Sequence, residues 1–158
     1  MSLADQAVAE LKSTEQFFNR STRGLSEEHS GVKPAPGMMS GAQQVAHAAQ
    51  TIDWFIEGAF RPEGFDTNFE AHAKAFEDCT SLTAARAWFG KAVTAAGATL
   101  STKSDAELMA PIAAGPIMGG APHMAIISDI TDHTAHHRGA LTVHARVSGI
   151  VPPMPYMD

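Results

Sequence analysis

Apolar residues recur at intervals of three and four along four long stretches of the chain, which is the spacing of one face of an α-helix. The stretches run from about Leu3 to Arg23, from Ser40 to Glu57, from Ser81 to Leu100 and from Pro122 to Ser148. Glycine and proline residues separate them. Because no run alternates with a period of two, the pattern predicts an all-α protein built as a four-helix bundle, without a sheet.

Two segments lie outside these stretches. Phe65, Phe69, His72 and Phe76 have helical spacing and predict a short extra helix. Residues 103–121 form a long connection rich in glycine, proline and apolar side chains. Connections of this length in a compact domain are usually functional or disordered, and the apolar residues favour packing. Covering the mouth of a site is one role open to this loop, and the sequence alone does not assign it.

The predicted fourth helix carries two histidines, His133 and His137, four residues apart. Four residues advance a helix by about 400° and roughly 6 Å, so the two rings lie one above the other. The same face carries Ile126, Ile130 and Leu141, which places the histidines toward the core. A divalent metal such as zinc or nickel would satisfy both rings, because neutral imidazole is a common ligand of either ion. For the pair alone, hydrogen-bonded core histidines are the alternative.

A third histidine, His47, lies in the second predicted helix with Thr51 and Trp54 on the same face. Two antiparallel helices would then close three imidazoles around one ion. A site of three histidines leaves a coordination position open, which is typical of catalytic zinc centres. We therefore predict that the metal ligands are His47, His133 and His137, and we assign no other catalytic residue.

Four more residues of the fourth helix receive secondary interpretations. His136 points about 100° away from His137, and His144 lies roughly 10 Å beyond that ligand, so neither is a predicted ligand. Asp129 either accepts a hydrogen bond from a ligand imidazole or is an exposed carboxylate. Arg138 either binds a substrate carboxylate or forms an interhelical ion pair.

Length, charge and cysteine usage narrow the functional classes. A chain of 158 residues is long enough for one domain, which we expect to span residues 1–158. The net charge of −6 and the absence of a dense Lys/Arg block disfavour nucleic-acid binding. The single cysteine, Cys79, excludes an internal disulfide and fits a reducing compartment. Without a signal-like N-terminus or a membrane-length apolar run, we expect a cytoplasmic protein that does not bind membranes.

The motifs of the chain resemble those of the DinB-like (YfiT-like) metalloenzyme superfamily. The matching pieces are His47 after the Pro/Gly loop, Gly120-Ala121-Pro122, the run from His133 to Gly139 that contains His-His-Arg-Gly, and Gly149 with Pro152-Pro153. The resemblance covers most of the chain. It implies an up-up-down-down bundle, a divalent metal held by three histidines and frequently a homodimer. The chain departs from the commonest pattern at Ala140, where a glutamine often follows Arg-Gly.

Characterised relatives include transferases and isomerases that use a low-molecular-weight thiol. An open metal position can lower the pKa of water toward about 7 or deprotonate a coordinated thiol. Neither effect requires a protein base, and no glutamate accompanies the histidine pair as in His-Glu-x-x-His proteases. We predict a metal-dependent transferase that acts on a small-molecule substrate by thiol-dependent S-transfer. A metal-dependent hydrolase and a non-catalytic metal-binding or regulatory bundle are the alternatives.

Two further expectations concern metal affinity and assembly. Metal affinity should weaken as the pH falls through roughly 6.5, the reference pKa of imidazole, because each ligand must lose its proton. Phe65, Phe69 and Phe76 lie outside the four long helices, where a single bundle would not fully bury them. Together with the family tendency, this predicts a homodimer whose metal sites lie within each chain.

Overall fold

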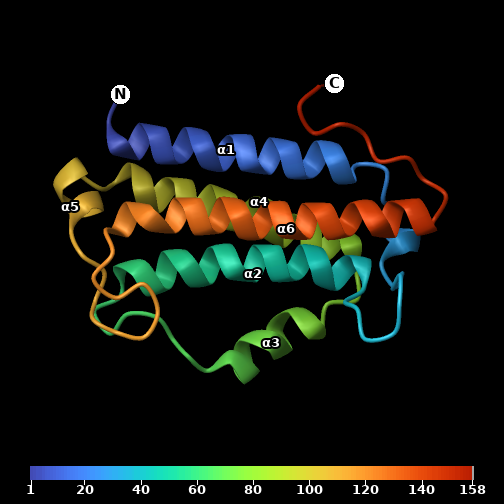
Figure 1. The fold of residues 1–158 in the computed structure, drawn as a ribbon, viewed down its shortest axis with the longest axis horizontal. Helices are drawn as coiled ribbons and strands as arrows, with labels where there is room; N and C mark the ends of the chain where they lie inside the picture. The colour runs from blue at the N-terminus through green and yellow to red at the C-terminus, as the bar shows by residue number, and fades with distance from the viewer. Residues whose placement is uncertain (158) are drawn as a thin grey trace.

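Four long helices form a bundle in the computed structural model, which describes residues 1–157 (Figure 1). They are α1 (Leu3–Thr22), α2 (Gly41–Phe60), α4 (Leu82–Ser101) and α6 (Ile126–Val147). Their ends agree with the sequence prediction to within about one turn. Asp158, the last residue of the predicted domain, lies outside the described residues.

The shorter elements connect the long helices. They are η1 (Glu27–His29), α3 (Phe69–Glu77), α5 (Asp105–Met109) and η2 (His123–Ala125). The short extra helix predicted around Phe69 is therefore present as α3. No β-strand occurs within residues 1–157, where the extended pairing is limited to one isolated bridge between Pro111 and Pro122.

A reciprocal cap fixes the start of α2, the helix that carries His47. The backbone N–H of Gln43 donates to Ser40 Oγ (3.3 Å), and the backbone N–H of Ser40 donates to Gln43 Oε1 (2.9 Å). These bonds satisfy two donors that lack partners within the helix, and such caps contribute about 1 kcal/mol. The cap thereby defines where the helical register of α2 begins, two turns before His47.

Each long helix has one parallel and one antiparallel neighbour in the bundle. α1 packs against α6 and α4, and α2 packs against the same two helices from the opposite corner. In Figure 1, α1 and α6 run in one direction, whereas α2 and α4 run in the other. Followed around the bundle, the helices point up, up, down and down, whereas in chain order α1, α2, α4 and α6 point up, down, down and up (Figure 1). α2 and α6, which carry the predicted ligands, are antiparallel neighbours.

Aromatic and aliphatic side chains fill the space between the helices. Phe18 of α1 stacks on Phe89 of α4, with ring centroids 4.4 Å apart, and both are at most 1% exposed. Leu11 of α1, Ile52 of α2 and Leu141 of α6 add further apolar side chains to this core. This core holds the four helices in fixed register, and the site described below depends on that register.

The aromatic residues around α3 are more buried than the sequence indicated. Phe76 is 6% exposed, and Phe65 is partly buried with its ring centroid 4.7 Å from that of Trp54. Phe69 remains 58% exposed. The homodimer stays a prediction, and of these three rings only Phe69 presents an exposed surface to a second chain.

The connection between α4 and α6 is ordered and packs against the end of the bundle. Leu108 of α5 and Ile112 are buried, and the backbone N–H of Ile112 donates to Ala121 O (2.8 Å). This confirms packing. The loop does not cover the pocket described below, which α3 and not residues 103–121 lines. No helix within residues 1–157 is both long enough and apolar enough to cross a membrane.

The stacked pair between α1 and α4 gives a direct test of the core. Phe89→Ala should lower the free energy of unfolding by about 3–5 kcal/mol, because the substitution removes a buried ring and leaves a cavity. Val143→Ala, at a position that is 45% exposed on α6, should change stability by less than about 0.5 kcal/mol. Chemical denaturation of both variants measures the difference. Equal losses would contradict the proposed core packing.

Candidate metal centre

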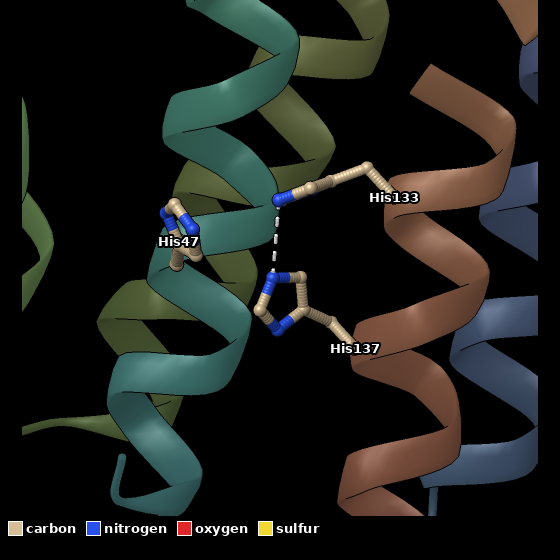
Figure 2. Close-up of side chains that lie close together, drawn as sticks. All are labelled: His47, His133 and His137. Atoms are coloured by element: carbon tan, nitrogen blue, oxygen red, sulfur yellow. Dashed lines mark hydrogen bonds between the residues drawn. The ribbon is translucent and has the colours of Figure 1, made fainter. Parts of the chain in front are cut away.

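The structure brings the three predicted ligands together between α2 and α6. His133 and His137 project from neighbouring turns of α6, and His47 faces them from α2 (Figure 2). One nitrogen from each ring can be chosen so that all three lie within 4.8 Å of one another. No further His, Cys, Asp or Glu of residues 1–157 joins this cluster. The three histidines therefore have the arrangement that one divalent ion requires, with room for an exogenous ligand.

The distance between the two α6 ligands fits a tetrahedral ion. His133 Nε2 and His137 Nε2 are 3.3 Å apart. Two nitrogens that each lie 2.0–2.1 Å from a tetrahedral zinc ion are separated by about 3.3 Å. The His47 ring is nearly perpendicular to both, with centroids 5.0 Å from His133 and 4.8 Å from His137. A small movement of the His47 ring would bring a third nitrogen within bonding distance of the same ion.

Gln44 fixes the tautomer of His137. The Nδ1–H of this histidine donates to the Gln44 side-chain carbonyl oxygen, Oε1, at 2.5 Å, and both side chains are buried. An amide oxygen only accepts, so Nδ1 carries the proton and Nε2 presents its lone pair. The sequence analysis missed Gln44. The available signal was its place three residues before His47, which puts the two side chains on one face of α2.

His47 has a buried nitrogen without a protein partner. Its Nδ1 makes no hydrogen bond, while the ring lies 4.1 Å from that of Phe76 on α3. An unpaired buried polar atom is unfavourable, and its presence needs an explanation. A metal ion bound by the three neutral imidazoles provides this explanation, because a ring nitrogen of His47 would then coordinate the ion. The donor set and this orphaned atom both fit the metal that the family resemblance implies.

The environment keeps all three histidines neutral. Burial, with a smaller contribution from the neighbouring histidines, lowers the pKa of His133 to about 4 and that of His137 to about 3. Burial also lowers the pKa of His47. Each imidazole therefore offers a lone pair at neutral pH without first losing a proton.

A pocket of about 330 Å³ opens beside the three histidines, between α2 and α3. His47 and His133 form part of its wall. The remaining polar lining residues are Gln50, Thr51 and His72, and no Asp, Glu, Lys or Arg lines it. The sequence analysis placed no functional residue on α3, because nothing in the spacing of α3 showed that this helix folds back over His47.

The secondary candidates on α6 lie away from the pocket. Asp129 and His136 are exposed, so the role considered for Asp129 falls to Gln44. His144 is fully buried, and its two nitrogens contact Ala140 O and Met39 O at 3.0 Å. Arg138 lies in a separate groove between α1 and α6 and forms no ion pair with the described residues, which contradicts the interhelical ion pair considered for it.

The contact between Gln44 and His137 predicts a specific effect on metal affinity. Gln44→Leu should weaken zinc binding by about 10-fold to 100-fold, because the imidazole loses the acceptor that orients it. Gln44→Glu keeps an acceptor at the same place and should retain most of the affinity. Competition titration against a chelator measures both. Equal affinities for the Leu variant and the unmodified protein would show that the contact does not orient a ligand.

The lowered pKa values revise the expected pH dependence. Protons compete with the metal only where the ligands are protonated, which for His133 and His137 means near pH 4 and pH 3. Above about pH 5, only His47, whose pKa is lowered from its ordinary value by burial, can then lose a proton on binding the metal. Zinc affinity should therefore fall by at most tenfold per pH unit between pH 8 and about pH 5, and not with the three protons that imidazoles of the reference pKa of about 6.5 would release. Calorimetric titrations in two buffers of different ionisation enthalpy at pH 6 should detect less than one released proton per chain. Release of two or three protons, or a steeper loss of affinity above pH 5, would contradict this.

A family model matches the sequence, and solved structures of known proteins share the fold. The DinB superfamily model matches residues 10–141. A DinB-like protein from Bacillus cereus is 21% identical with a TM-score of 0.68, over 91% of this chain and 89% of that chain. A DinB-like protein from Bacillus subtilis is 20% identical with a TM-score of 0.68, over 94% and 95% of the two chains.

YfiT from Bacillus subtilis, a four-helix bundle of unusual topology, is 14% identical with a TM-score of 0.68, over 93% of this chain and 88% of that chain. At these identities, the structural likeness concerns the fold. No curated protein sequence matches the chain. The family model spans most of the sequence, from the middle of α1 to Leu141, and includes all three histidines of the centre. The chain belongs to the DinB superfamily.

Proposed function

We propose that this protein is a divalent-metal-dependent transferase that joins a low-molecular-weight thiol to a small electrophilic molecule. The observation that carries the proposal is the cluster of His47, His133 and His137 beside an open pocket, without a fourth ligand from the described residues. Closed structural zinc sites have four protein ligands, whereas catalytic sites keep one position free. Imidazole suits zinc, copper, iron and nickel, and of these we propose zinc or nickel.

The side chains around the centre would prepare it for this chemistry. The lowered pKa values keep the imidazoles neutral, and Gln44 holds the tautomer in which His137 Nε2 faces the pocket side of the cluster. A bound divalent ion would supply positive charge that lowers the pKa of a thiol or of water at the open position. Phe76 covers one face of the His47 ring and limits access of bulk water from that side.

The absence of a carboxylate from the pocket lining favours thiol transfer over hydrolysis. Activation of water by metalloproteases uses a glutamate close to the ion, and no Asp or Glu among the described residues lines this pocket. A thiol has a reference pKa of about 8.5, so the charge of the ion alone is enough to generate its anion.

Metal-dependent hydrolysis is the second candidate. YfiT from Bacillus subtilis, which shares the fold, is described as a probable metal-dependent hydrolase. For this chain, the ion alone would have to generate the hydroxide, because no carboxylate lines the pocket wall. Both candidates require the same metal centre, so the nucleophile is what distinguishes them.

A proton-release experiment tests the proposal. The zinc-loaded and nickel-loaded proteins are mixed with a small thiol such as 2-mercaptoethanol at pH 7 in a weak buffer with a pH indicator. About one proton per chain should be released, because a thiol that is mostly protonated at this pH becomes an anion at the metal. His47→Ala should lose both the bound metal and the proton release, and His136→Ala on the exposed face of α6 should keep both.

Each outcome separates the candidates. Proton release by the thiol, followed by consumption of the thiol when an alkyl halide or epoxide is added, supports transfer. Metal at about one equivalent without proton release, together with ester hydrolysis that depends on the metal, would favour the hydrolase. Metal without either activity would indicate a non-catalytic bundle. Full metal content in a variant with all three histidines changed to alanine would refute the centre itself.

A further inference from the structure

Two histidines that line the same pocket from different helices each have a buried nitrogen without a hydrogen-bond partner. The two nitrogens are His47 Nδ1 on α2 and His72 Nε2 on α3. The proposed metal centre accounts for His47. It leaves His72 unexplained, because this histidine is not part of the three-histidine cluster. A buried donor or acceptor left without a partner costs about 1–3 kcal/mol, so His72 Nε2 calls for a ligand of its own.

The His72 nitrogen is covered by protein atoms, and its nearest polar neighbour is a carboxylate. Asp66 Oδ2 lies 3.4 Å away, but the pair does not have the geometry of a hydrogen bond. The His72 ring also meets Trp54 edge-on, with centroids 6.3 Å apart. These contacts hold the ring at the pocket wall without satisfying Nε2.

The rest of the wall is aromatic and uncharged. Trp54 and Phe55 of α2 and Phe69 and Phe76 of α3 line the pocket. The indole N–H of Trp54 donates to Asp66 O (2.8 Å), so Trp54 offers the pocket its ring and no free donor. Phe69 is exposed because it stands at the rim of this pocket, where a bound molecule would cover it.

We propose that this pocket binds an uncharged, planar, mainly apolar molecule that carries one hydrogen-bonding group, and that His72 Nε2 binds this group. The inference rests on the proposed function, because it places the reacting end of such a molecule near His47 and His133. Charged molecules are disfavoured, since no Asp, Glu, Lys or Arg lines the wall to compensate for the loss of water. The volume of about 330 Å³ suits a two-ring molecule. His72 is a positioning residue in this arrangement.

Calorimetric titration of the full-length protein tests the ligand class. The probes are 2-naphthol, 2-naphthoate and 2-naphthylmethylammonium, used with metal-stripped protein so that no ion attracts the carboxylate. The neutral 2-naphthol should bind most tightly, because neither charged probe finds a partner in the wall. Tighter binding of 2-naphthoate or of the ammonium compound would overturn the proposal.

Two substitutions on α3 locate the ligand. Ala73 lines the pocket, whereas Ala71 is exposed on the outer side of the same helix. Ala73→Phe should abolish 2-naphthol binding by filling the pocket, and Ala71→Phe should leave the affinity within about twofold. Undiminished binding in a folded Ala73→Phe variant, with circular dichroism as the check, would place the ligand elsewhere and refute the proposal.

A third comparison tests His72. His72→Phe should weaken 2-naphthol binding about fivefold, while leaving the binding of naphthalene, which lacks the hydroxyl group, unchanged. His72→Gln can still hydrogen-bond and should restore most of the affinity for 2-naphthol. Equal weakening of both ligands would mean that His72 only shapes the pocket. The metal content of each variant is measured as well. Loss of 2-naphthol binding with full metal content concerns the pocket alone, whereas loss of the metal would concern the proposed function.

Discussion

The antiparallel contact between α2 and α6 is the constraint on which the centre depends. It sets Gln44 against His137 and His47 opposite His133 and His137, so that polar groups from distant parts of the chain meet inside an apolar bundle. Burial makes protonation of these imidazoles costly, which leaves them as neutral donors of electron pairs. The apolar core that surrounds the contact holds the two helices in register. Packing and ligand chemistry are therefore consequences of the same helix pairing.

Much of the architecture was predictable because helical periodicity is a local property. The four long helices, the separate short helix and the shared face of His133 and His137 all follow from residues within a few turns of one another. The position of His47 opposite that pair is a long-range feature. It was reached through the helix face that carries His47 together with the family motif, and the structure shows the three rings converging.

The features that the sequence did not reveal depend on how segments fold back in space. α3 lies over His47 and brings Phe76 and His72 to the pocket, although its own spacing indicates only an amphipathic helix. For the same reason, the sequence did not show that the loop at residues 103–121 packs away from the pocket. The reference pKa of imidazole gives a steeper pH expectation than the buried site does, because it contains no information about burial. Gln44 was missed because a glutamine on a helix face is ordinary until its partner is known.

The three ligands come from two helices that lie far apart in the sequence, and this has a consequence for folding. An ion held by His47 together with the pair on α6 would close a loop that contains more than half of the chain. A cross-link of that length removes many conformations from the unfolded ensemble, as a disulfide does, although this one is reversible. The protein has a single cysteine and so forms no internal disulfide. Its resistance to heat would then follow the concentration of free metal in its surroundings.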